Sequence, residues 1–159
     1  MEMGQKKKEI KITPIKKGTV IDHINSGQAP LVLKILGIEA GTKIIVSLVM
    51  NVQSQRLGKK DIVMIEDREL NTKETNKIAL IAPNATINII RDCQVVKKEK
   101  VHPPEIIEEI LKCQNPNCIS NDEKEPINSK FILENLDPVI LKCHYCGMEL
   151  EDIPKAIKY

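Results

Sequence analysis

The run Lys97-Lys-Glu-Lys-Val-His-Pro-Pro104 divides the chain into two unequal parts. Adjacent prolines lack the backbone N–H that a helix interior or a central strand requires, and the lysines before them favour solvent. We therefore expect a boundary between a domain over residues 1–101 and a second domain over residues 102–159. A unit as short as the second buries little apolar surface, so its fold needs an additional staple.

The residues before this boundary predict alternating strands and helices. The apolar residues from Ile10 to Ile21 favour a strand that is broken at Lys17-Gly18. Residues 26–37 favour a largely buried helix with Ser26 as its N-cap and Pro30 in its first turn. Further elements are expected over residues 43–51, 60–66, 71–81, 85–90 and 94–96, where 71–81 is a helix with a capping box from Asn71 to Glu74. The order β-α-β-β-α-β, with one extra strand, predicts an α+β fold that begins with a ferredoxin-like domain.

Four of the five cysteines follow the boundary, in the close-spaced pairs Cys113-Gln-Asn-Pro-Asn-Cys118 and Cys143-His-Tyr-Cys146. Such pairs in a cytosolic protein indicate a metal site before they indicate disulfides. Four thiolates bind Zn²⁺ tetrahedrally at about 2.3 Å and leave no open position for catalysis. We expect one structural Zn²⁺, held by Cys113, Cys118, Cys143 and Cys146, to staple a small, mainly antiparallel β zinc domain. Two disulfides, as some thermophilic cytosolic proteins have, are the alternative.

Composition and charge narrow the classes of function. Aromatic residues make up only 2% of the chain, which argues against stacking platforms for single-stranded nucleic acid. Residues 1–101 carry a net charge of +7 and residues 102–159 a net charge of −5, so an anionic ligand prefers the first part. The acidic cysteine-rich part repels phosphates, which favours contact with protein over contact with nucleic acid. The polar start and the lack of a long apolar run predict a cytoplasmic protein with no membrane segment.

The remaining candidate chemistry lies in the basic part. No catalytic triad, phosphate loop or carboxylate pair occurs, so an enzyme has no constellation to support it. Asp22 could accept hydrogen bonds from ribose hydroxyls, while Lys60, Lys97 and Lys98 could meet a triphosphate. On the residues alone, lysines along strand edges are more often a solvated face. The lone thiol of Cys93 is expected to be half-buried and inert.

Several segments resemble the regulatory chain of aspartate carbamoyltransferase. The likeness runs through Gly18-Thr-Val-Ile-Asp-His-Ile24, Gly58-Lys-Lys-Asp-Ile62, Ala82-Pro-Asn-Ala-Thr-Ile-Asn88 and both cysteine pairs, in order over nearly the whole chain. The 25 isoleucines and 21 lysines also fit a thermophilic source.

The resemblance implies a non-catalytic subunit that tunes the first committed step of pyrimidine biosynthesis. Its first domain would dimerise and bind CTP, ATP and, in some members, UTP, and its zinc domain would bind the catalytic chain. The matching effector residues are Ile12, Ile15, Val20, Asp22, His23, Asn88, Ile90, Val95 and Lys98, and Lys60 is added to them for its charge. Met64 and Cys93 depart from the pattern, since relatives carry a lysine and a tyrosine there. The alternative function is a zinc-ribbon protein that binds nucleic acid through its basic first domain.

Overall fold

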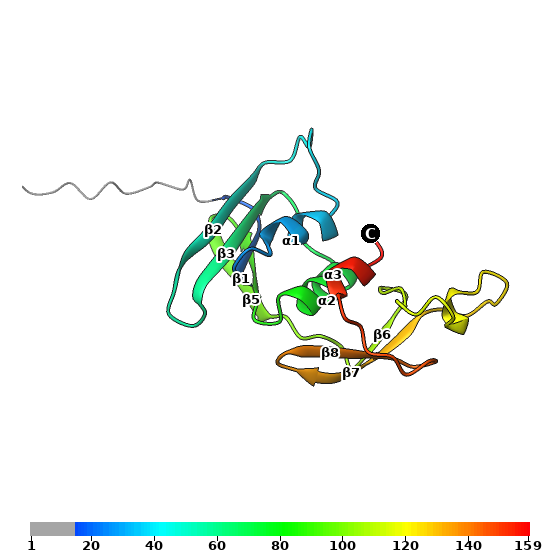
Figure 1. The fold of residues 1–159 in the computed structure, drawn as a ribbon. Helices are drawn as coiled ribbons and strands as arrows, with labels where there is room; N and C mark the ends of the chain where they lie inside the picture. Colours follow the sequence, from blue (N-terminus) through cyan, green and yellow to red (C-terminus); the bar gives the residue numbers. More distant parts are fainter. Residues whose placement is uncertain (1–14) are drawn as a thin grey trace, which may run out of the picture.

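The computed structural model describes residues 15–159 (Figure 1). Ile10 and Ile12, which are expected in the first strand, lie outside the described residues, and Ile12 is also one of the expected effector residues. A five-stranded antiparallel sheet occupies the first part of the described chain. Its strands are β1 (Gly18–Asn25), β2 (Val46–Ser54), β3 (Gly58–Glu66), β4 (Thr86–Arg91) and β5 (Gln94–Lys100), and its helices are α1 (Ala29–Ile35) and α2 (Thr72–Ile81).

The strand order β2-β3-β1-β4-β5 confirms the ferredoxin-like prediction. Strands β2, β3, β1 and β4 form the four-stranded antiparallel sheet of that fold, and β5 adds an edge strand beside β4. The register between β1 and β4 aligns Val20 with Asn88, and the register between β4 and β5 aligns Asn88 with Lys98. Residues aligned in this way present their side chains on the same face of the sheet.

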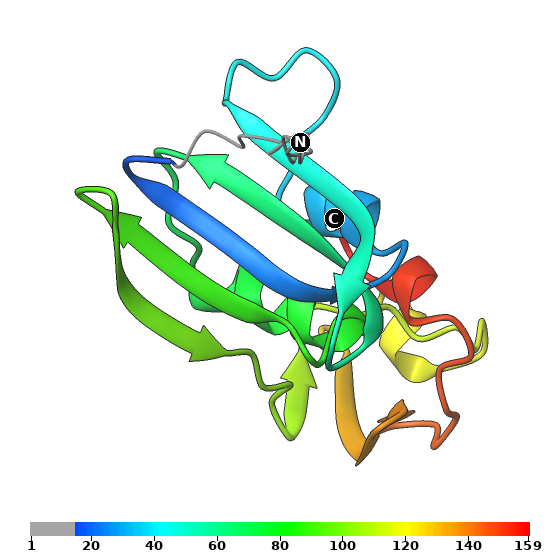
Figure 2. The same ribbon diagram turned by 90° about the vertical axis from the view of Figure 1, so that its left-hand side faces the viewer.

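Both helices cover one face of this sheet. Ile21 and Val63 from the strands belong to one core with Val32 of α1 and Ile78 of α2, and all four side chains are fully buried. Figure 1 shows the two helices on the side of the sheet that faces the C-terminal part, and Figure 2 looks onto the other, helix-free face. We call the helix-free side, which carries Val20, Asn88 and Lys98, the open face.

The two helix starts show how far local sequence determines capping. Asn71 caps α2, and Glu74 completes the expected capping box. The prediction for α1 was wrong at its start, because the helix begins at Ala29 after Gln28, and Ser26 instead hydrogen-bonds to Asn51. The N–H of Ala29 donates to the buried carboxylate of Asp61 on β3, so the α1 cap comes from a distant strand.

The C-terminal part is a three-stranded antiparallel sheet in the order β6-β7-β8, as predicted. Its elements are β6 (Ile106–Glu108), the short 3-10 helix η1 (Ile119–Asn121), β7 (Lys130–Leu136), β8 (Val139–Cys143) and α3 (Ile153–Ala156). Phe131 on β7 and Leu141 on β8 are fully buried. The buried apolar cluster of the first sheet continues without interruption into this part.

The segment between the two sheets differs in detail from the prediction. The last strand of the first sheet does not end at residue 96, since β5 continues to Lys100, and every residue of β5 is exposed. Pairing with β4 holds this polar run as a strand, and lysines at a sheet edge discourage pairing with another chain. No helix among residues 15–159 is long and apolar enough to cross a membrane.

Candidate metal centre and open face

The four paired cysteines converge on one point. Their Sγ atoms all lie within 4.8 Å of one another, with Cys113 and Cys146 3.6 Å apart and Cys118 and Cys143 3.7 Å apart. Four thiolates bound to Zn²⁺ at about 2.3 Å would lie about 3.8 Å from one another, so the observed spacing fits the metal. All four thiols are free, which argues against the two-disulfide alternative.

Short turns hold the sulfurs in place. In the first pair, the N–H of Cys118 donates to the carbonyl oxygen of Asn115, and the side-chain amide of Asn121 donates to the carbonyl oxygens of Cys113 and Asn115. In the second pair, Gly147 adopts a φ of +76° and donates its N–H to the carbonyl oxygen of Cys143. A glycine is favoured there because a side chain would strain this left-handed conformation.

Burial and hydrogen bonding give the thiols different acidities. Burial raises the pKa of Cys113, and neighbouring thiols raise it further. Burial also disfavours the thiolate of Cys146, but hydrogen bonds from the Met148 backbone N–H and the Asn115 side chain lower its pKa to about 7. A thiolate at this position is a ready first ligand for a divalent cation. Four sulfur ligands complete the tetrahedral coordination of a single structural Zn²⁺ and leave no position for a bound water.

The open face gathers most of the other predicted site residues. Register places Val20, Asn88 and Lys98 in one row across β1, β4 and β5, and the Asn88 side chain donates to the Val20 carbonyl oxygen at 3.3 Å. Val95 aligns with Ile90 on the same face. Ile15 and Ile90 are buried but lie outside the core beneath the helices. Lys97 aligns with Ile89 and therefore faces the other way, so it does not join this group.

A bulge in β1 brings Asp22 and His23 together at one end of this face. The register shifts between Ile21 and Ile24, so that Asp22 and His23 both oppose Ile62 of β3. His23 adopts a φ of +56°, which is uncommon for a residue with a side chain. The bulge lets two successive side chains contact each other instead of pointing to opposite faces.

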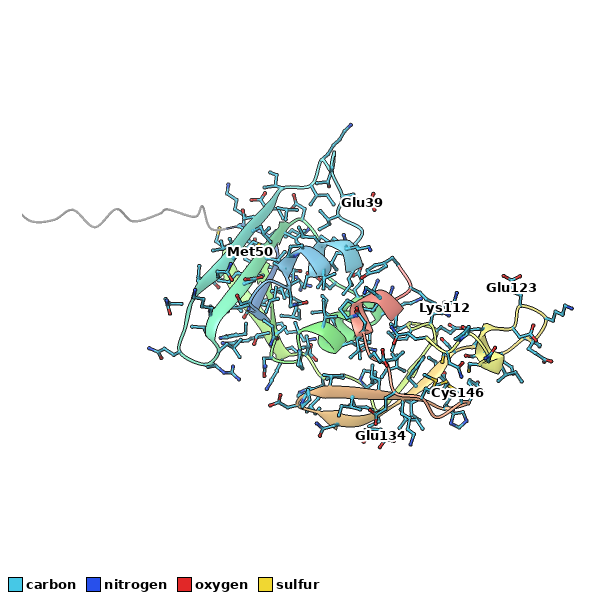
Figure 3. The ribbon with its side chains drawn as sticks, in the orientation of Figure 1. Glu39, Met50, Lys112, Glu123, Glu134 and Cys146 are labelled. Carbon is cyan, nitrogen blue, oxygen red and sulfur yellow. The ribbon has the colours of Figure 1, made fainter. Side chains whose placement is uncertain are left out.

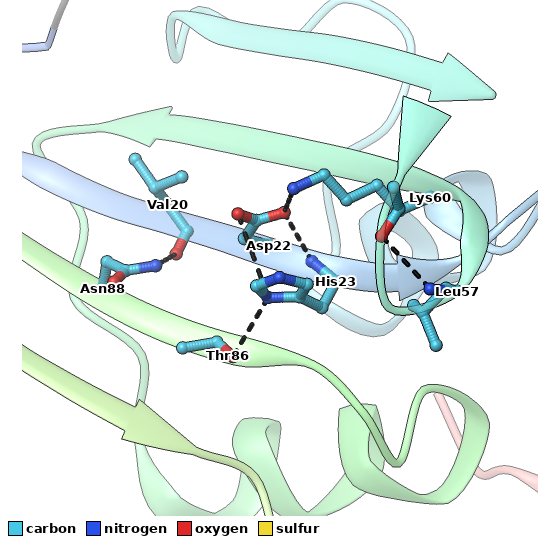
Figure 4. Close-up of polar contacts among 8 residues, drawn as sticks. Val20, Asp22, His23, Leu57, Lys60, Thr86 and Asn88 are labelled. Carbon is cyan, nitrogen blue, oxygen red and sulfur yellow. Dashed lines mark hydrogen bonds and ion pairs between the residues drawn. The ribbon is translucent and has the colours of Figure 1, made fainter. Parts of the chain in front are cut away.

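Two polar side chains, those of Lys60 and Thr86, lie beside this pair (Figure 4). Lys60 Nζ lies 2.8 Å from Asp22 Oδ1, and the His23 backbone N–H donates to the same carboxylate at 2.6 Å. His23 Nδ1 lies 3.3 Å from Thr86 Oγ1 and 3.9 Å from Asp22 Oδ2. The structure thus brings together three residues of the expected effector site, Asp22, His23 and Lys60. Thr86, which was not among the expected residues, lies beside them.

These contacts shift the acidities of both groups. Partial burial opposes ionisation of Asp22, but hydrogen bonds from Lys60 and from the His23 backbone outweigh it and lower the pKa of the carboxyl group. Burial is the main cause that lowers the pKa of His23. Asp22 opposes that shift, whereas the positive charges of Lys60, Arg56 and Lys98 add to it. The imidazole is therefore neutral at pH 7 in a cationic environment.

Besides Lys97 and Thr86, three further residues differ from the expectation or have a role that the sequence analysis missed. Cys93 is exposed in the β4–β5 turn, not half-buried. Asp61 was missed because its role depends on three backbone partners from other segments, at Gly27, Ala29 and Asn51. Arg56 was missed because only the β2–β3 hairpin brings its charge near His23. The one signal for it in the sequence is a cation two residues before a turn glycine, Gly58.

The two candidate sites are well separated. Figure 3 shows Cys146 at the end of the molecule opposite Met50, which lies on β2 in the first sheet. A ligand on the open face and a metal among the cysteines therefore occupy different parts of the chain, linked by the continuous buried core.

Comparison with known proteins identifies the family. A family model described as aspartate carbamoyltransferase regulatory chain, allosteric domain, matches residues 10–102, and one described as its metal binding domain matches residues 105–153. The aspartate carbamoyltransferase regulatory chain of Archaeoglobus fulgidus is 52% identical over 151 residues, which cover 94% of this chain and 99% of the relative. That of Methanothrix thermoacetophila is 56% identical over 145 residues, which cover 91% of this chain and 94% of the relative. Together with the ferredoxin-like sheet and the four-cysteine cluster, these matches show that the chain belongs to the aspartate carbamoyltransferase regulatory chain family.

Proposed function

We propose that the chain is a non-catalytic subunit that binds nucleotide effectors on its open face and passes their effect to an aspartate carbamoyltransferase catalytic chain. The proposal keeps the two domains expected from the sequence: residues 1–101 would bind the effector and residues 102–159 would hold the zinc. The observation that carries the proposal is the group formed by Asp22, His23 and Lys60 on the open face. This face belongs to the first part of the chain, residues 1–101, whose net charge is +7. The four clustered cysteines form no disulfide, and reduced cysteines that can bind a metal are typical of a cytoplasmic protein.

The chemistry of this group suits a nucleoside triphosphate. A carboxylate such as Asp22 can accept hydrogen bonds from two ribose hydroxyls, and its low pKa keeps it ionised. Lys60 and Lys98 supply positive charge for phosphates, with His23 beside them. The base would lie over the apolar and amide side chains of the same face: Ile15, Val20, Asn88, Ile90 and Val95. CTP, ATP and UTP share the ribose and phosphate parts that this arrangement addresses.

The zinc domain offers a surface for the catalytic chain. Ile119, Tyr145 and Met148 follow or flank the cysteine ligands and are 47%, 39% and 46% exposed. Apolar and aromatic groups beside a rigid metal site are typical of a protein interface. The net charge of −5 in this part disfavours contact with nucleic acid through the zinc domain itself, which leaves a protein surface as its better partner.

The edge of the first sheet supports dimerisation through the effector domain. Strand β2 is an outer strand, and Ile45, Leu48 and Met50 on or just before it are 62%, 42% and 37% exposed. An unpaired edge with apolar side chains favours pairing with a second chain, whereas the other edge, β5, carries charged residues throughout its second half.

Regulation would act as a coupling free energy. A nucleotide that binds one quaternary state more tightly than another shifts the equilibrium between them, typically by about 1–3 kcal/mol. The buried cluster shared by the two sheets is a physical route for that coupling.

Calorimetric titration of CTP into the zinc-loaded chain tests the proposal, with Asp22→Ala as the matched variant. We expect saturable binding that Asp22→Ala removes. Binding that Asp22→Ala leaves unchanged would move the ligand off this face. Salt-dependent retention on DNA that CTP does not affect would favour the nucleic-acid alternative.

A further inference from the structure

Arg56 lies at the apex of a tight hairpin between β2 and β3. Ser54 pairs with Gly58, which leaves the three-residue loop 55–57. The Leu57 backbone N–H donates to Ser54 Oγ, and Gly58 adopts a φ of +74°. A three-residue loop followed directly by a left-handed glycine closes the hairpin tightly and leaves Arg56 at its tip.

This hairpin lies at the same end of the sheet as Asp22 and His23. Lys60, two residues after Gly58, aligns with Asn25, and Asn25 lies two residues after His23. Figure 4 shows Leu57, the neighbour of Arg56, beside Lys60 at this end of β1. The loop therefore borders the polar group of the open face.

Arg56 carries a charge that the described chain does not neutralise. It is exposed, and no carboxylate among residues 15–159 forms an ion pair with it. The nearby acid, Asp22, is already paired with Lys60. The positive charge of Arg56 is also close enough to His23 to lower the pKa of the imidazole, as are the charges of Lys60 and Lys98. Cations from a hairpin, from β3 and from β5 thus converge on one point, with a single carboxylate among them.

We propose that Arg56 binds the terminal phosphates of the effector, so that the site selects nucleotides by the length of their phosphate chain. This inference rests on the proposed nucleotide site and adds to it a residue and a preference. A guanidinium offers a planar fork of N–H donors that matches two phosphate oxygens. Because the hairpin borders the group that holds the ribose, Arg56 adds its charge to those of Lys60 and Lys98 around the phosphates that extend from the sugar.

Two variants of the zinc-loaded full chain test the proposal by calorimetry. Arg56→Gln removes the charge at the apex, and Lys59→Gln removes an equal charge from the same hairpin on the other face of β3, beside Gln53. With CTP, we expect Arg56→Gln to weaken binding about fivefold, as for a partly exposed ion pair, and to lessen the dependence on salt. With CMP it should weaken binding much less, and Lys59→Gln should have little effect on either ligand.

Inorganic tripolyphosphate separates this inference from the proposed function. Binding of tripolyphosphate that depends on Arg56, without binding of CTP, would support the phosphate role of Arg56 and overturn the nucleotide proposal. Equal weakening of CTP and CMP by Arg56→Gln, or equal effects of Arg56→Gln and Lys59→Gln on CTP, would overturn the inference while leaving the nucleotide site intact. A wild-type chain that binds neither CTP nor tripolyphosphate would overturn both.

Discussion

The buried carboxylate of Asp61 accepts a hydrogen bond of 2.9 Å from the backbone N–H of Asn51. Asn51 lies in a bulge of β2, where Met50 and Asn51 together oppose Asp61, and it adopts a φ of +58°. The other carboxylate oxygen accepts from the N–H groups of Gly27 and Ala29. One side chain thus fixes the β2 bulge, the turn after β1 and the start of α1, and these three segments surround the end of the sheet that carries Asp22 and His23.

We expect Asp61→Ala to destabilise the fold by about 3 kcal/mol, because it leaves three backbone N–H groups without their acceptor in a buried place. Urea unfolding of the zinc-loaded chain measures this, with the exposed Glu39→Ala as a control for loss of one carboxylate. A change for Asp61→Ala as small as that for Glu39→Ala would show that water replaces the carboxylate at little cost.

Asp61 also marks where sequence reasoning stops. The capping box from Asn71 to Glu74 could be predicted because both partners lie within one helical turn. The start of α1 could not, because its cap comes from a residue 32 positions further along the chain. The cysteine cluster was predictable since spacing alone encodes a metal site, and its geometry bears the prediction out.

The open face was only partly predictable for a related reason. Strand periodicity places neighbouring residues on opposite faces, but which of Lys97 and Lys98 faces the site depends on the bulge that shifts the β4–β5 register. The contact between Asp22 and His23 likewise depends on a bulge, and the proximity of Arg56 depends on a hairpin. Sequence alone identified the residue types, whereas the pairing of strands decided which of them meet.

The lowered pKa of His23 predicts a dependence of stability on pH. In the unfolded chain the imidazole titrates near 6.5, and in the folded chain it titrates lower, so below that pH the unfolded chain binds more protons. The contribution of His23 to stability is therefore fully present above pH 6.5 and decreases as the pH falls toward the folded-state pKa. Acid also releases metal from thiolates, so the useful quantity is the difference between wild type and His23→Gln.

Urea unfolding at pH 5.5 and pH 7.5 measures this difference. The wild type should lose more free energy of unfolding than His23→Gln on going to the lower pH. The same loss in both proteins would mean that the imidazole titrates alike in the folded and unfolded chain.

Removal of the metal should unfold the three-stranded sheet selectively. Metal binding contributes folding free energy to a unit this small, and the bonds of Asn121 to Cys113 and Asn115 order only the loop, not the whole sheet. We expect chelation at elevated temperature, or Cys113→Ser, to abolish amide protection over residues 102–159 and to prevent assembly with a catalytic chain, while CTP binding to the first sheet remains.

The matched control is Cys93→Ser, which removes the one exposed thiol outside the metal cluster of the described chain. Hydrogen exchange reports the protection, and a sizing column reports the assembly. Intact assemblies formed by Cys113→Ser would refute the structural role of the metal, as would a far-UV spectrum unchanged after its removal.

Neighbouring lysines on β5 provide a test of which face binds the effector. Lys98 aligns with Asn88 on the open face, whereas Lys97 aligns with Ile89 on the other face and pairs with Glu99 at 3.0 Å. Each variant to alanine removes one charge from an exposed strand, so a general electrostatic effect should be the same for both.

We expect Lys98→Ala to weaken the binding of CTP several-fold more than the binding of cytidine, because only the triphosphate meets the ammonium group. Lys97→Ala should change the binding of neither ligand. Calorimetry with both ligands measures the two ratios. Equal weakening of CTP and cytidine by Lys98→Ala would place Lys98 away from the phosphates, and a larger effect from Lys97→Ala would move the site to the helix side of the sheet.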